Sequence, residues 1–110
     1  MTTQEARAAR DAGIKQAAEH AEEVHTGWTD EALEAIRLYA TCMRARNHTF
    51  TAEQMRNSII GQCVPVPPHK RAWGAAFKRA AAEGLIVKVG TAQSVAPHCH
   101  LSYVSEWRAA

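Results

Sequence analysis

Residues 67–86 read PPHKRAWGAAFKRAAAEGLI and predict a helix that runs directly into a strand. Proline is tolerated in the first turn of a helix, where its missing N–H has no partner, and Gly84 suits a left-handed C-terminal cap. We therefore expect a helix over residues 68–83. At about 100° per residue, Trp73 and Phe77 share one face of this helix. This spacing predicts a face buried in a core rather than one that stacks on unpaired bases.

The opposite face of this helix is basic, with small residues between its cations that would let a polyanion approach closely. Lys and Arg contacts to phosphates supply most non-specific DNA affinity, and a bidentate arginine can read guanine. We expect Arg71 to reach base edges, and Lys78 and Arg79 to hold phosphates. A face whose cations only confer solubility is the alternative. The predicted DNA-binding residues are His69, Lys70, Arg71, Gly74, Ala75, Lys78, Arg79 and Lys88.

Charge is distributed unevenly along the 110 residues, although the formal net charge is only +2. Between Arg44 and Lys88, eight cations are opposed only by Glu53 and Glu83. A basic segment of this kind is typical of proteins that meet phosphates or acidic surfaces, and a solvated face of mixed charge is the alternative. The length predicts one modest core.

The three cysteines, Cys42, Cys63 and Cys99, are odd in number and follow no repeated spacing. We therefore expect a reducing, cytoplasmic setting rather than a disulfide framework. No basic segment followed by an apolar one marks a leader after Met1. No run approaches the roughly 20 apolar residues of a membrane span, so no membrane partner is expected.

Residues 3–25 form an alanine-rich helical pattern with a thin apolar stripe. Two interpretations stay open, because a narrow stripe suits a helix packed on the flank of the domain or an arm that pairs with a second copy. In the second case we expect a homodimer through residues 3–25. The stripe consists of Ile14, Ala17, Ala18, Ala21 and Val24.

A second helix is predicted to begin at Trp28-Thr29, with Thr29 as its N-cap. Trp28 and Leu33 occupy the positions of a hydrophobic staple, and the acidic residues that follow Thr29 suit the positive end of the helix dipole. The segment of residues 44–47, which contains Arg44 and Arg46, is expected to end this helix.

A third helix is predicted by the capping box of Thr51 and Gln54. We expect it to end at Gly61, and to be followed by an extended proline-rich connector over residues 62–68, because the residue before a proline is driven away from helical angles. Its apolar face is expected to comprise Met55, Ile59 and Ile60.

Two short strands are predicted after the central helix, at residues 85–89 and 101–105. Residues 90–100 link them, so they form a β-hairpin with a long tip. A two-stranded hairpin is marginal alone and must pack on helices, so we expect Trp107 to fill the core beneath it.

The predicted chain is mainly α with a C-terminal β-hairpin. Over residues 28–107 its order of elements resembles the winged helix-turn-helix fold, with an N-terminal helical arm of residues 1–27 added to a domain of residues 28–110. The resemblance implies that the helix of residues 68–83 enters the major groove of double-stranded DNA and that the hairpin forms the wing. The proline-rich connector departs from the brief turn that is usual in this family, which would tilt the helix in the groove.

The segments Arg71-Ala72-Trp73-Gly74, Phe77, Arg79-Ala80 and Gly84-Leu85-Ile86 are similar to segments of small phage and prophage proteins. This resemblance implies a protein in the cytoplasm or nucleoid of a bacterial host cell. One expected function is therefore a DNA-binding regulator or replication accessory. The alternative is a protein-interaction module that docks on a host replication, defence or transcription protein, which is favoured by the mild net charge and by the lack of Lys and Arg in residues 90–100.

The sequence offers little for catalysis or metal binding. His98-Cys99-His100 is the strongest metal candidate, but adjacent loop residues do not readily bind one ion, so a polar wing tip is the preferred interpretation. His20 and His25 lie five residues apart, about 140° around a helix, and cannot share zinc as in a zinc-protease motif. No nucleophile elbow, phosphate-binding glycine loop or carboxylate pair stands out. We expect no enzyme activity, no metal and no cofactor.

Overall fold

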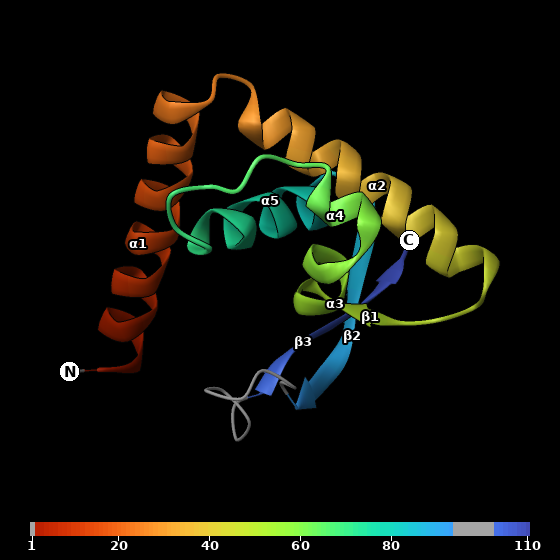
Figure 1. Cartoon of the computed structure of the whole chain (residues 1–110). Coiled ribbons are helices and arrows are strands. Elements are labelled where there is room, and N and C mark those ends of the chain that lie inside the picture. Colours follow the sequence, from red (N-terminus) through yellow and green to blue (C-terminus); the bar gives the residue numbers. More distant parts are fainter. Residues whose placement is uncertain (1, 94–102) are drawn as a thin grey trace.

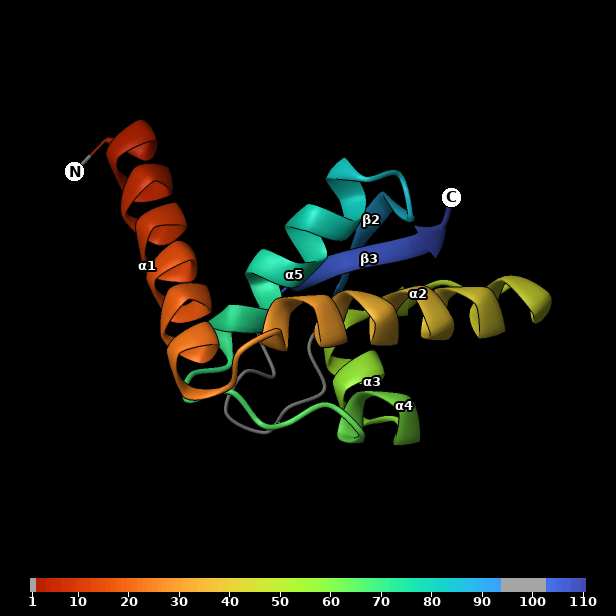
Figure 2. The same cartoon turned by 90° about the horizontal axis from the view of Figure 1, so that it is seen from above.

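The computed structural model describes residues 2–93 and 103–110. Helices α1 and α2 form a V with α5 between them, and a small antiparallel sheet lies beside α5 (Figure 1, Figure 2). The described chain is therefore mainly helical with a small sheet near its C-terminus, as predicted. In chain order, the elements are α1 (Thr3–Val24), α2 (Trp28–Ala45), β1 (Phe50–Thr51), α3 (Ala52–Asn57), α4 (Ile59–Gln62), α5 (Arg71–Ala82), β2 (Ile86–Gln93) and β3 (Tyr103–Ala109).

A side chain of α1 takes the capping role that was predicted for Thr29, so that prediction is wrong. Gly27 adopts a left-handed conformation with φ 85°, and Trp28 is the first residue of α2. The Glu22 carboxylate accepts hydrogen bonds from the backbone N–H groups of Gly27 at 2.7 Å and Thr29 at 3.2 Å. These bonds favour the charged carboxylate and hold the pKa of Glu22 below its ordinary value.

The capping box that opens α3 is confirmed. Thr51 Oγ1 accepts a hydrogen bond from the N–H of Gln54 at 3.2 Å, and Gln54 Oε1 accepts one from the N–H of Thr51 at 3.0 Å. The predicted end of this helix is wrong, because the extended backbone of Ser58 (φ −75°, ψ 164°) breaks it three residues before Gly61. Gly61 lies buried inside α4, and Ile59 is 84% exposed rather than part of the apolar face.

Helix α5 begins later than predicted and ends as predicted. Its first residue is Arg71, because the two prolines lie in the turn that precedes the helix. In this turn His69 Nδ1 accepts a hydrogen bond from the N–H of Arg71 at 3.1 Å. At the other end Gly84 is left-handed with φ 77°, and the N–H of Leu85 reaches the carbonyl of Ala80 at 2.9 Å. This is the glycine cap that lets the chain turn directly into β2.

The strands pair in the order β1-β3-β2, and both pairings are antiparallel. The predicted pairing of β2 with β3 is confirmed, and both strands are longer than expected. Strand β1 was not predicted; the pairing of Phe50 with Trp107 defines its place. Trp107 packs against the core as expected, with its ring centroid 5.9 Å from that of Phe77. His98-Cys99-His100 lies outside the described residues.

The core joins α2, α3, α5 and the sheet. Trp73 and Phe77 are only 6% and 3% exposed, which confirms their predicted burial. Trp28 packs edge-on against Trp73 with ring centroids 5.1 Å apart, and its Nε1 donates to the carbonyl oxygen of Pro65 at 2.7 Å. This hydrogen bond ties the proline-rich connector to α2. The largest fully buried side chains are Trp28, Phe50, Ile36, Met55 and Ile86.

Helix α1 packs on α5 of the same chain, which covers part of its apolar stripe and leaves Val24 64% exposed. Ala21 is buried in the core, and Ile14 lies against Gly74, where an added Cβ would be 3.5 Å from Ile14 Cδ1. Pairing with a second copy through residues 3–25 stays a prediction. Within the two described ranges, no helix combines the length and apolar character needed to cross a bilayer.

Candidate nucleic-acid interface

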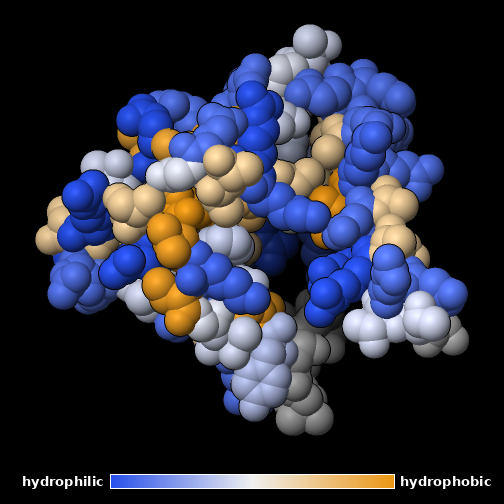
Figure 3. All heavy atoms as spheres, turned by 180° about the vertical axis from the view of Figure 1, so that it is seen from behind, coloured by the Kyte–Doolittle hydropathy of each residue, from blue (hydrophilic) through white to orange (hydrophobic). Residues whose placement is uncertain are grey.

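A cleft lies between α1 and the body of the molecule, with α5 as its floor. Two adjoining grooves, of about 620 Å³ and 500 Å³, share five lining residues and so form one hollow. Residues of α1 form one wall, and residues of α3 and β3 form the other. Figure 3 shows the molecule hollowed between α1 and the body, with hydrophilic residues around the hollow. The shared residues are Arg10, Ile14, Ala52, Arg56 and Gly74.

The cleft carries a surplus of positive charge, with six cations against the carboxylates of Asp11 and Glu53. Asp11 Oδ1 lies 3.1 Å from Lys78 Nζ and 4.0 Å from Arg10 Nε. Arg56 Nε is buried and has no hydrogen-bond partner within the described part of the chain. This surplus favours an anionic ligand, because walls of low dielectric constant concentrate the field. The cations are Arg10, Arg56, Lys70, Arg71, Lys78 and Lys88.

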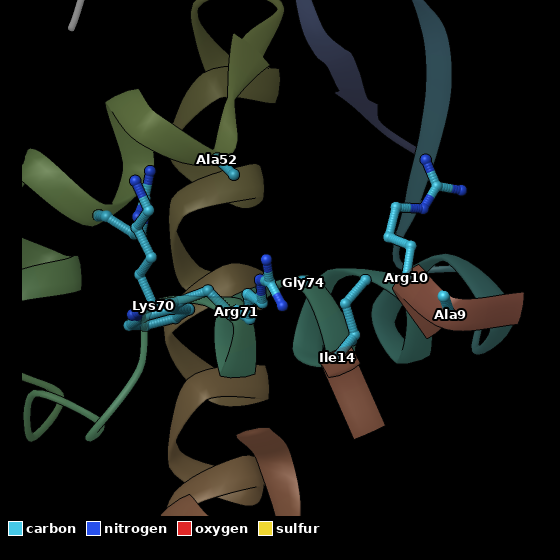
Figure 4. Close-up of a pocket in the computed structure, with 9 residues that line it drawn as sticks. Ala9, Arg10, Ile14, Ala52, Lys70, Arg71 and Gly74 are labelled. Carbon is cyan, nitrogen blue, oxygen red and sulfur yellow. The ribbon is translucent and has the colours of Figure 1, made fainter. Parts of the chain in front are cut away.

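Two helices supply most of the groove at the start of α5, as Figure 4 shows. Arg10 and Ile14 project from α1, whereas Arg71 and Gly74 belong to the first turns of α5. The guanidinium of Arg71 lies on the surface of α1, since a Cβ added to Gly13 would be 3.0 Å from its Nη1. The contact places the Arg71 charge at the junction of the two helices.

The cleft gathers some of the predicted DNA-binding residues and leaves others outside. His69 lines a separate groove with α1, and Ala75 lines another on the side of α5 that faces the start of α2. Arg79 is engaged elsewhere, with Nη1 3.7 Å from Asp30 Oδ1 and Nε 2.7 Å from Glu83 Oε2. The predicted residues that line the cleft are Lys70, Arg71, Gly74, Lys78 and Lys88.

The small residues of α5 receive α1 rather than open solvent. Gly74 and Ala75 are both half-buried, and Ile14 of α1 packs on the first of them. Small side chains allow close approach by a helix as well as by DNA, and the alanine-rich stripe of α1 supplies such a helix. The predicted open basic face is therefore narrowed to a cleft along one side of α1.

Two cleft cations were absent from the predicted set, namely Arg10 and Arg56. Arg10 precedes Ile14 by four residues, so helical periodicity already placed it on the side of α1 that packs inward. Arg56 follows the buried Met55 and lines the cleft from α3. The helical position of Arg10 was a usable signal, whereas the place of Arg56 depended on how α3 packs beside α5.

No metal-binding group of three or more His, Cys, Asp or Glu side chains occurs within residues 2–93 and 103–110. Cys42 and Cys63 are both exposed. No family model, curated protein or solved structure matches this chain.

Proposed function

We propose that this chain is a winged helix protein that binds DNA through the cleft beside α5, as a regulator or replication accessory. Helix α2, strand β1, helices α3 to α5 and the hairpin of β2 and β3 follow one another in the order of a winged helix domain. The central position of β3 in the sheet and the place of α5 directly before the hairpin agree with that fold.

The observation that carries this proposal is the excess of cations over carboxylates in the cleft. Lys70 and Arg71 stand at the N-terminal end of α5, where the helix dipole also favours an anion. We assign Lys70, Arg56 and Lys88 to phosphates. Arg71 is assigned to a base edge, because a guanidinium can bind guanine through two hydrogen bonds.

Fluorescence anisotropy with one labelled sequence, in single-stranded and duplex form, tests this function. Arg71→Ala should weaken binding about tenfold, and Lys70→Ala should lower the slope of log K against log salt by about one. Arg79→Ala is the matched control, because Arg79 is a cation of the same helix and already forms an ion pair with Glu83. It should change affinity less than about twofold. Failure to bind either form at low salt would refute the proposal.

A second candidate function, a protein-interaction module, is favoured by the exposed apolar side chains of Ile59 and Val66. They are 84% and 91% exposed, in α4 and in the proline-rich connector. A pull-down from nuclease-treated bacterial lysate should then retain a protein partner, and Val66→Ser should lose it. Loss of every partner on nuclease treatment would contradict this function.

A further inference from the structure

We infer that the cleft receives a single DNA strand rather than a duplex. This inference rests on the proposed function, since it specifies which form of DNA the same surface accepts. Three features of the described residues support it: the width of the helix pair, the opposed cations of the two walls, and an exposed aromatic ring.

The width of the pair formed by α1 and α5 opposes entry into a major groove. That groove is about 12 Å wide and admits one helix, whose diameter with side chains is about 10–12 Å. Packed helices lie about 8–10 Å apart, so the two helices together span roughly 20 Å where α1 crosses α5 (Figure 1, Figure 2). Because Ile14 packs on Gly74, a duplex that approaches this face of α5 meets α1 at that point.

Cations stand on both walls of the cleft, which suits a backbone that lies between them. Arg10 belongs to α1, whereas Arg56 belongs to α3 and Lys88 to β2. The two parts of the hollow, about 620 Å³ and 500 Å³, have the size of small-ligand pockets, which span about 300–1,000 Å³. This size suits a short stretch of one strand better than a duplex.

An exposed aromatic ring lines the same hollow as these cations. Tyr103, the first residue of β3, lines the cleft and is 73% exposed, so its ring contributes little to the core. Proteins that bind single strands combine a basic groove with aromatic side chains on which unpaired bases stack. Lys88 lines the same part of the cleft and pairs with Trp107, four residues along β3 from Tyr103, so one strand of DNA could reach both.

The stacking role of Tyr103 is tested by anisotropy with a labelled 12-nucleotide single strand and the duplex of the same sequence. The wild-type protein should bind the single strand more tightly. Tyr103→Ala should weaken single-strand binding about tenfold, whereas Tyr103→Phe, which keeps the ring, should bind as the wild type does. Duplex binding should be the same in all three proteins. Because Tyr103 is exposed, neither change threatens the fold.

The contribution of α1 is tested by Arg10→Ala, with Arg7→Ala as the matched control. Both remove an arginine from the same end of α1, and only Arg10 lines the cleft. Arg10→Ala should lower single-strand affinity several-fold and reduce its salt dependence, and Arg7→Ala should change it less than twofold.

The outcomes separate this inference from the proposed function. Binding of neither DNA form overturns both. Equal affinity for the two forms, or a preference for the duplex that depends on Arg71 and not on Tyr103, overturns the inference and leaves the proposed function standing. A single-strand preference that neither Tyr103→Ala nor Arg10→Ala changes also overturns it, because the strand would then bind elsewhere.

Discussion

Replacing Gly61 by alanine should destabilise the protein strongly, because the added methyl group has no room. An ideal Cβ at this position lies 2.2 Å from the carbonyl oxygen of Met55, and 2.8 Å from both Cα and O of Arg56. Backbone atoms cannot rotate away, so α3 and α4 must separate by about 1 Å to restore ordinary contact. That movement strains Ser58, whose Oγ donates to the Met55 carbonyl at 2.6 Å and accepts from the Gly61 N–H at 3.2 Å.

The expected loss for Gly61→Ala is about 3 kcal/mol, from overpacking of about 2 kcal/mol and one weakened hydrogen bond of about 1 kcal/mol. For a chain of this size it corresponds to a Tm lower by about 12 °C. Thermal and urea unfolding followed by far-UV circular dichroism measure both values.

Gly84→Ala is the matched control, because its Cβ has open space and only the left-handed φ of 77° opposes it. We expect a cost of about 1–2 kcal/mol there. The close approach of α4 to α3 is refuted if the Tm of Gly61→Ala lies within 3 °C of the wild-type Tm, or if it is higher than the Tm of Gly84→Ala.

Three further changes probe other contacts. Trp28→Phe should cost about 1–2 kcal/mol in urea unfolding, because it leaves the Pro65 carbonyl without its indole donor. Glu22→Gln should melt below the wild type at pH 7, and the gap should close as pH falls below 4.5, because a carboxylate with a lowered pKa stabilises the fold only while it stays charged. Asp11→Asn should shift stability by less than about 0.5 kcal/mol, because its ion pair with Lys78 is exposed. The same variant should raise DNA affinity in anisotropy, and unchanged affinity would contradict the role of Lys78 in the cleft.

Elements whose signals are local were predicted well from the sequence. The capping box of Thr51 and Gln54 spans four residues, and the glycine cap at Gly84 depends on backbone conformation at one position. The cap of α2 was missed because Glu22 belongs to the preceding helix and reaches it only after the chain has turned at Gly27. Strand β1 was missed because two residues are too few to show the alternation of apolar and polar side chains in a strand. Its pairing partner also lies near the C-terminus, far away in the sequence.

The residues of the candidate site also divide into those with a local signal in the sequence and those whose place depends on tertiary packing. The cations of α5 were visible because their spacing along one helix is local. Which of them share a surface depends on tertiary packing: Arg79 is drawn to Asp30 of α2, whereas Arg10 reaches the cleft because α1 lies on α5. The pattern of charge along the chain predicts an anionic partner, and that stays a prediction. The packing of α1 changes the expected open basic face into a cleft.

The edge-on contact of Trp28 with Trp73 also supplies an optical probe of the molecule. Two indoles with centroids 5.1 Å apart and planes inclined by 73° couple their electronic transitions, so they contribute a near-ultraviolet dichroic band that depends on fixed packing. Trp73 also lines the cleft. Its emission should therefore respond when the cleft is filled, and unlabelled oligonucleotides can be titrated by intrinsic fluorescence.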